Sequence, residues 1–68
     1  MNKFIIFINH SDAQLEAADY AMYMVSKGRM HPGDQVEVRS HRHNDVVVCD
    51  VVEGGLSHNG YQFATFGE

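Results

Sequence analysis

The sequence predicts an α+β fold in which one helix packs on a mostly antiparallel sheet of four strands, in the chain order β-α-β-β-β. Two observations favour this class. β-Branched and aromatic residues gather in four short runs, and one segment carries apolar residues at helical spacing. The chain has 68 residues, enough for one core, so we expect residues 1–68 to form a single small domain.

The first half of the chain is predicted to form a strand followed by a long helix. Lys3–Ile8 is apolar on both of its alternating sets, which is typical of a strand that is covered on both faces. Ser11 and Gln14 fit a capping box that opens a helix over Asp12–Lys27, and Gly28 fits the position just after its end. The residues expected on its buried face are Leu15, Ala17, Ala18, Ala21, Met22, Met24 and Val25.

The second half is predicted to form three strands. His31–Asp34 has the residues of a type II turn, and Gln35–Ser40 then alternates as a half-exposed strand. A right-handed parallel crossover could join this strand to the first, because the helix between them is long enough. Val46–Glu53 is a dense β-branched run, Gly54–Gly60 is expected to be a loop, and Tyr61–Phe66 is the last strand.

The second face of this sheet needs a cover. One helix covers one face, whereas Lys3–Ile8 and Val46–Glu53 are apolar on both. Three solutions exist: the sheet curls into a barrel, pairs with a second copy, or binds a partner protein. Each large apolar side chain left in water forgoes about 1.5–3 kcal/mol, which a chain of this size can hardly spare. We therefore favour a contact with a partner or a second copy over a curled core.

Composition and charge exclude several classes of protein. Cys49 is the single cysteine, so the chain has no intramolecular disulfide or paired-thiolate zinc site, and we expect a cytoplasmic protein. Its place among valines predicts a small buried hydrophobe. Five Lys and Arg against nine Asp and Glu give a charge of −4, which argues against direct nucleic-acid binding. No apolar run is long enough for a membrane span.

The sequence contains no motif typical of catalysis, so we expect a non-enzymatic protein without a metal or cofactor. His41 and His43 share a side of an extended segment with Asp45, and such groups can bind zinc or nickel. Arg39 and Arg42 lie beside them, and their charge opposes a cation. A solvated hairpin tip is therefore the preferred interpretation, and a histidine-based metal-binding protein is the remote alternative.

Helical spacing places three acids and an aromatic residue in one stripe, which is either a plain solvated face or a surface for a basic groove. Tyrosine is favoured at interface hot spots, and complementary charge speeds association. Arginines and histidines around residues 39–43 form a local basic patch. The candidate partner-binding residues are Asp12, Glu16, Asp19 and Tyr23 first, then Arg39, Arg42 and Tyr61.

The length, the acidic balance and the lone helix carrying Asp12, Glu16 and Asp19 resemble small inhibitor proteins encoded by bacteriophages, including anti-CRISPR proteins. Leu15–Asp19 followed by Gln35–Val38 is a pattern common among such proteins and among unrelated small α/β domains. The resemblance covers size, charge and architecture and transfers no residue's role. It implies stoichiometric binding to a larger host complex, often at its nucleic-acid-binding surface.

The predicted function is therefore a non-enzymatic protein-binding module, an inhibitor of a larger host complex of the CRISPR type. It would act through the acidic helix face or the apolar sheet face. The alternative is a homo-oligomeric structural or regulatory subunit that uses the same sheet face to bind itself.

Overall fold

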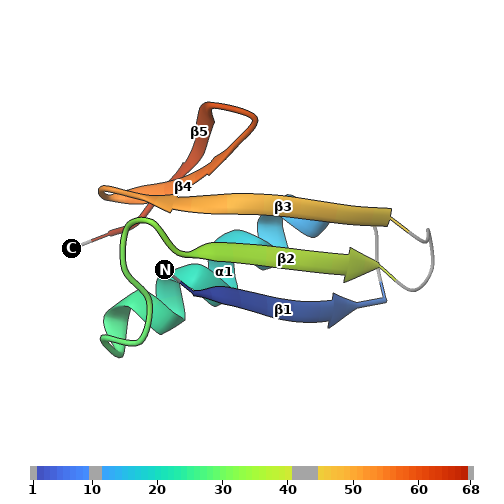
Figure 1. Cartoon of the computed structure of the whole chain (residues 1–68), viewed down its shortest axis with the longest axis horizontal. Helices are drawn as coiled ribbons and strands as arrows, with labels where there is room; N and C mark the ends of the chain where they lie inside the picture. The colour runs from blue at the N-terminus through green and yellow to red at the C-terminus, as the bar shows by residue number, and fades with distance from the viewer. Residues whose placement is uncertain (1, 10–11, 41–44, 68) are drawn as a thin grey trace.

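A computed structural model describes residues 2–9, 12–40 and 45–67 (Figure 1). Its elements are β1 (Lys3–Ile8), α1 (Ala13–Ser26), β2 (Gln35–Ser40), β3 (Asp45–Val52), β4 (Gly55–His58) and β5 (Tyr61–Thr65). The strands form one sheet in the order β1-β2-β3-β4-β5. β1 runs parallel to β2, and the other neighbours are antiparallel. The predicted α+β class and the parallel crossover through the helix are confirmed.

The predicted loop over Gly54–Gly60 is wrong, because it contains the extra strand β4. Leu56 on this strand is fully buried, and the strand pairs with both β3 and β5. Glycines on both sides had indicated a loop, but they serve the tight turns at its ends. Gly54 and Gly60 have φ values of +75° and +85°, which glycine adopts without strain.

Local signals determine both ends of α1. The carboxylate of Asp12 accepts a hydrogen bond from the Leu15 backbone N–H at 3.1 Å, so Asp12 is the N-cap. The predicted cap, Ser11, lies outside the described residues. At the other end Gly28 has a φ of +70° and its N–H donates to the Val25 carbonyl at 3.0 Å. This confirms the predicted position of Gly28 after the helix.

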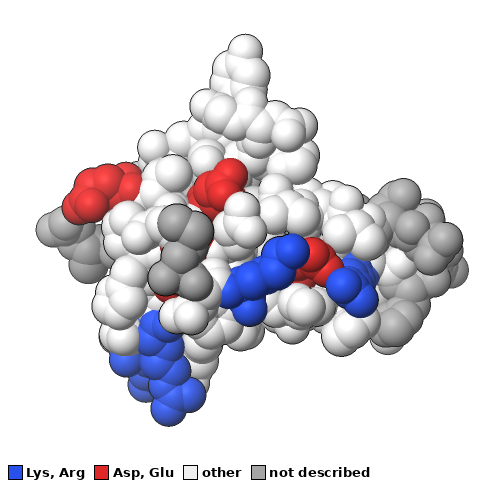
Figure 2. Space-filling model, in the orientation of Figure 1, with Lys and Arg blue, Asp and Glu red and all other residues white. Residues whose placement is uncertain are grey.

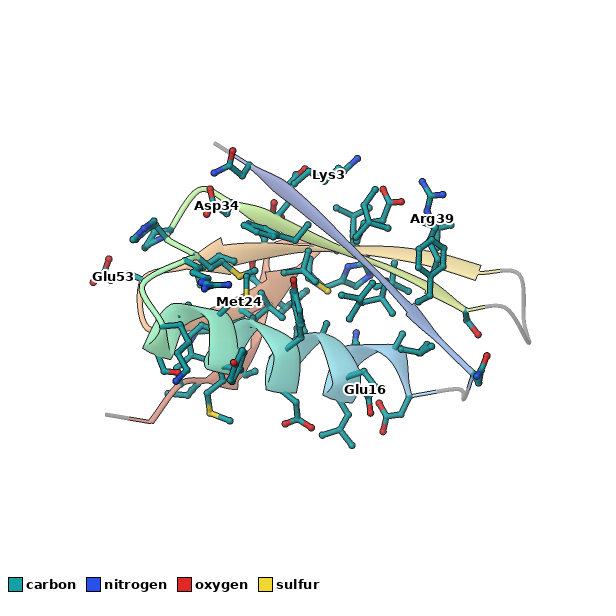
Figure 3. The ribbon with its side chains drawn as sticks, turned by 90° about the horizontal axis from the view of Figure 1, so that it is seen from below. Lys3, Glu16, Met24, Asp34, Arg39 and Glu53 are labelled. Carbon is teal, nitrogen blue, oxygen red and sulfur yellow. The ribbon has the colours of Figure 1, made fainter. Side chains whose placement is uncertain are left out.

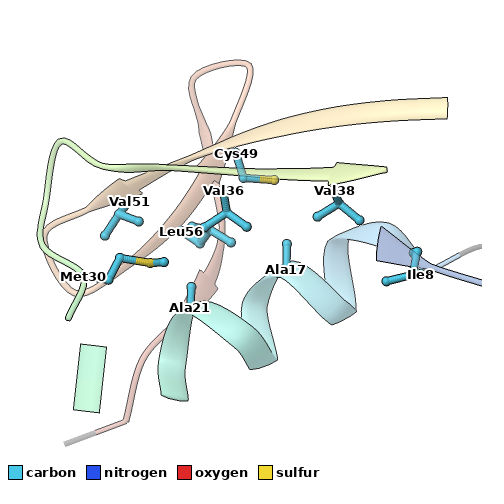
Figure 4. Packing of buried hydrophobic residues seen from close by; sticks show 9 residues of the cluster. All are labelled: Ile8, Ala17, Ala21, Met30, Val36, Val38, Cys49, Val51 and Leu56. Atoms are coloured by element: carbon cyan, nitrogen blue, oxygen red, sulfur yellow. The ribbon is translucent and has the colours of Figure 1, made fainter. Parts of the chain in front are cut away.

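The core lies between α1 and one face of the sheet (Figure 4). Two fully buried alanines, Ala17 and Ala21, allow the helix to approach the strands closely. Met30, which follows the helix, closes one end of the core and is 1% exposed. The remaining buried apolar residues are Ile8, Val36, Val38, Cys49, Val51 and Leu56. α1 packs mainly on β2 and only marginally on β1.

Asp34 joins the connection after the helix to the start of the chain. Its two carboxylate oxygens accept hydrogen bonds from the backbone N–H groups of Asn2 and His31, each at 3.0 Å. The Asp34 N–H donates to the His31 carbonyl, and Gly33 has a φ of +101°, as the predicted type II turn requires. The two backbone donors hold the pKa of Asp34 below its ordinary value.

Candidate functional site

The face of the sheet opposite α1 has no element of the described chain packed on it. Alternate residues of a strand point to opposite faces, so the residues that do not face the helix lie here. We call this surface the open face; on β1, β2 and β3 it consists of Lys3, Ile5, Phe7, Gln35, Glu37, Arg39, Val46, Val48, Asp50 and Val52. Figure 3 shows Lys3 and Arg39 projecting away from the helix. β1 and β5 are at opposite ends of the sheet, so the strands do not close into a barrel.

Three large apolar side chains on the open face are exposed to solvent. Ile5 is 46% exposed, and Phe7 and Val46 are each 58% exposed. The strand register sets Phe7, Arg39 and Val46 in one row across β1, β2 and β3. The neighbouring row holds Ile5, Glu37 and Val48. Apolar side chains therefore lie on both sides of the charged residues of β2.

Glu37 is the buried charge at the centre of the open face. Its carboxylate lies 3.1 Å from Lys3 Nζ and accepts a second hydrogen bond from Arg39 Nε. The Glu37 side chain is 7% exposed, whereas those of Lys3 and Arg39 are about half exposed. Hydrogen bonds from Arg39 and then Lys3 outweigh the effect of burial and hold the pKa of Glu37 below its ordinary value. In Figure 2 this charge cluster appears as a row of blue, red and blue groups with white, uncharged surface above and below it.

A polar row closes one end of the open face. Gln35 Nε2 donates to the Asp50 carboxylate at 3.1 Å, across β2 and β3.

His58 connects the β4–β5 turn to β3. Its Nδ1 lies 2.9 Å from the Val48 carbonyl, and Asn59 Nδ2 lies 3.3 Å from its Nε2. The simplest assignment is that Nδ1 carries the proton and Nε2 accepts, which fixes the β4–β5 turn to β3.

The predicted acidic stripe lies along α1, on the other side of the molecule. Asp12, Asp19 and Tyr23 are exposed, and Glu16 is half-buried. The Lys27 ammonium lies 5.6 Å from the centre of the Tyr23 ring, which is a cation–π distance. Leu15 and Met22 share this outer side, and they are 55% and 44% exposed. Their predicted place in the core is wrong, because the buried side of α1 is centred on its alanines.

The structure does not bring the predicted partner-binding residues into one site. Asp12, Glu16, Asp19 and Tyr23 are on α1. Arg39 is on the open face, and Tyr61 is 81% exposed at the start of β5. Arg42 lies outside the described residues. Ile5, Phe7, Val46 and Glu37 were not predicted as binding residues. The signal for the three apolar ones was the alternation of their strands, which predicted that a second sheet face would need a cover.

Among the described residues, shallow grooves border the helix on two sides. One, of about 290 Å³, is lined by Asp12, Gln14, Leu15, Ala18, Phe63 and Ala64. The other, of about 260 Å³, is lined by Val25, Pro32, Val51, Val52, Glu53, Gly54, Phe66 and Gly67. Each contains a single carboxylate and no second titratable group, and both are at the small end of the range for ligand pockets.

The described residues, 2–9, 12–40 and 45–67, offer neither a metal-binding cluster nor a reactive thiol. No three His, Cys, Asp or Glu side chains in these ranges are grouped to hold a metal ion. His41 and His43 lie outside them. Cys49 is fully buried, and burial followed by the charge of Asp50 raises its pKa to about 11. Its thiol is therefore protonated at neutral pH and fills the core, as predicted.

Comparisons with known proteins give no relative. No protein-family model matches the chain, and no match was found among curated proteins or solved structures. In the described part of the chain, no helix has the length and apolar character needed to cross a membrane.

Stability is expected to fall in acid through Asp34 and Glu37. Both carboxylates have pKa values below their ordinary 3.8 and 4.5 in the folded protein. The stability that they contribute is complete above these ordinary values and is lost as pH falls through the lower folded ones. We expect the melting temperature to fall once the pH is below about 4. Asp34→Asn should weaken this dependence on pH. Melting curves from pH 7 to pH 3 test this, with the exposed Asp19→Asn as control; equal pH dependence in all three proteins would contradict it.

Proposed function

We propose that this chain is a non-enzymatic protein-binding module whose main binding surface is the open face of the sheet. The observation that carries the proposal is the grouping of exposed Ile5, Phe7 and Val46 around the ion-paired Glu37. Apolar patches with polar rims on small proteins commonly mark interaction sites. This assigns the main binding role to the sheet and a secondary one to the acidic helix stripe.

The chemistry of the open face favours a protein as the partner. The three large apolar side chains on it are about half exposed, so burying each of them in a complex contributes roughly 0.8–1.5 kcal/mol. The face is a sheet surface rather than a pocket, which suits a protein partner. Arginine is enriched at interface hot spots, and Arg39 is held in place by Glu37. Nucleic acid is a poor fit, because Glu37 neutralises part of the charge of Lys3 and Arg39 and the whole chain carries −4.

In this proposal the chain acts by occupying a surface of its partner in fixed stoichiometry. That mode of action agrees with the resemblance to phage-encoded inhibitors of the anti-CRISPR type. The acidic stripe on α1 supplies a second surface on the other side of the molecule, which would let the protein bridge two partners. A cytoplasmic location fits the single, buried Cys49, which needs no oxidising compartment.

Affinity capture with paired variants tests the proposal. The tagged wild type, Phe7→Lys with Val46→Lys, and Leu15→Lys with Met22→Lys are used as bait in lysate of the source cell or its host. Each pair replaces two exposed apolar residues, on the open face and on the helix respectively. We expect the wild type and the helix variant to capture one protein, or an untagged copy, in near-stoichiometric amount. We expect at least tenfold less with the open-face variant.

Circular dichroism shows whether each bait is folded. Capture that is retained by a folded open-face variant and lost by the helix variant would move the binding surface to α1. The absence of any stoichiometric protein, including an untagged copy, would refute the protein-binding proposal.

A further inference from the structure

We infer that a second copy of this chain binds along β1, with the two β1 strands antiparallel across a two-fold axis and the two sheets joined into one. This inference rests on the proposed function. It identifies a second copy of this chain as the protein that binds the part of the open face on β1. Four features of the described residues support it: the backbone groups at the edge, the pairing of side chains, the position of the helix and the distribution of charge.

The outer edge of β1 has backbone groups that can pair with another strand. The Gln35 N–H donates to the Asn2 carbonyl at 2.9 Å, and alternate residues of a parallel strand face the same neighbour. The N–H and C=O of Lys3 and Ile5 therefore point away from β2. Within the described residues no strand lies beyond β1. Proline, bulges and central charges usually protect such an edge, and β1 has none of these.

The side chains of β1 match a second β1 in antiparallel register. With the two-fold axis at Ile6, the two Ile6 residues face each other, Ile5 faces Phe7 of the second copy, and Phe4 faces its Ile8. Every one of these pairs is apolar, and both members of each pair lie on the same face of the joined sheet. The two Lys3 residues lie at opposite ends of the junction. A parallel arrangement would set them side by side.

The position of α1 leaves room for a neighbouring chain beside the outer edge of β1, on the helix side of the sheet. The helix packs mainly on β2, so Phe4 and Ile6 are only partly buried on the helix side. The flank of α1 with Leu15 and Ala18 faces β5 across a groove. The opposite flank, with Tyr20 and Tyr23 among its residues, is therefore turned toward the β1 end of the sheet. A second β1 would lie beside this flank and would cover the helix side of the first.

The distribution of charge favours an antiparallel over a parallel arrangement of the two copies. Asp12 caps the start of α1, Glu16 and Asp19 lie in its first half, and Lys27 and Arg29 follow its end. In Figure 1 the C-terminal end of α1 extends past the free edge of β1. A two-fold axis at β1 makes the two helices run in opposite directions, so their basic ends lie at opposite ends of the junction. A parallel arrangement would bring these like charges to the same end, which is unfavourable.

The other terminal strand offers a poorer edge. β5 pairs with β4 through a register shift between Leu56 and Ser57, and such irregularities twist a strand away from an approaching one. It also carries two exposed polar residues, Gln62 and Thr65. β1 is therefore the edge at which two copies are expected to join.

Sedimentation velocity of the full chain over roughly 1 µM to 1 mM tests the inference, because small interfaces dissociate in this range. We expect a monomer–dimer equilibrium in the wild type. Ile5→Pro removes only an outward N–H and leaves the β1–β2 hydrogen bonds of Phe4 and Ile6, so it should raise the dissociation constant at least tenfold. Ile5→Lys should do the same without a backbone change, and Leu15→Lys, on the helix, should have no effect.

Circular dichroism reports whether Ile5→Pro is folded, and Ile5→Lys decides the matter if it is not. A wild type that is monomeric throughout would overturn the inference, and so would dimers that both Ile5 variants leave unchanged. Neither result removes the proposed function, which fails only if capture also fails. If the chain is monomeric but captures another protein through the open face, the proposed function stands. Only the identification of a second copy as the partner would then be wrong.

Discussion

Replacing Gly55 with alanine is expected to be among the most damaging single substitutions in this protein. A Cβ at this position would overlap the carbonyl oxygen of Ala64 and would lie 2.5 Å from Gln62 Nε2. The Gln62 side chain can move, but the Ala64 oxygen belongs to the backbone of β5. Relief therefore requires β4 and β5 to separate. We expect a loss of about 3 kcal/mol, the upper end for overpacking, and a fall in melting temperature of roughly 12–24 °C.

Gly67→Ala is the matched control, because a Cβ there would have no atom within 4 Å and the residue does not have a positive φ. Thermal unfolding followed by circular dichroism measures both variants. Gly67→Ala should melt with the wild type. A Gly55→Ala variant that melts within about 2 °C of the wild type would show that the β4–β5 pairing described above is incorrect.

Glycine has two different roles in this region, and the sequence does not distinguish them. Gly54 and Gly60 have positive φ values, so they end strands as the prediction assumed. Gly55 lies inside β4, where the closeness of β5 leaves no space for a side chain. Five of the residues from 54 to 60 are Gly, Ser or Asn, which is why β4 was predicted to be a loop. Only the position of a neighbouring strand shows why Gly55 is there.

Elements defined by local signals were predicted well. The bounds of β1 and β2 are those predicted, and Gly28 and Gly33 have the predicted roles. The buried side of α1 was less predictable, because apolar residues occur on most of its circumference. Leu15 and Met22 were assigned to the core on spacing alone. Their exposure depends on the close approach of Ala17 and Ala21 to the sheet, which is a tertiary property.

The candidate site depends on contacts between distant parts of the chain. The acidic stripe depends only on residue spacing along one helix, so it could be predicted directly from the sequence. The ion pairs of Glu37 with Lys3 and Arg39 depend on β1 and β2 being parallel neighbours in a specific register. The exposed apolar face was expected from the composition of the strands. Which residues form it follows only from the strand order and from the side that α1 occupies.

Disulfide formation between two copies carrying Ile6→Cys is the second large effect expected. In the proposed register the two residues at position 6 face each other in a non-hydrogen-bonded antiparallel pair. Their Cα atoms would be about 4.5 Å apart, which a disulfide spans. Cys49 can stay in place, because its thiol is buried and has a pKa of about 11. We expect most of the folded Ile6→Cys protein to become a covalent dimer during mild oxidation.

Two controls separate this pairing from random collision. Tyr61→Cys places a thiol at a residue that is 81% exposed and far from β1 in strand order, so it reports the background rate. Adding Ile5→Pro to Ile6→Cys should reduce crosslinking to that background, because it removes the edge N–H that a second strand would use.

The rate of this crosslinking, followed on non-reducing gels, tests most directly whether β1 is a protein-binding edge. The account predicts that Ile6→Cys forms dimers at least tenfold faster than Tyr61→Cys under native conditions, and that denaturant removes the difference. Equal rates for the two variants in the folded protein would contradict it.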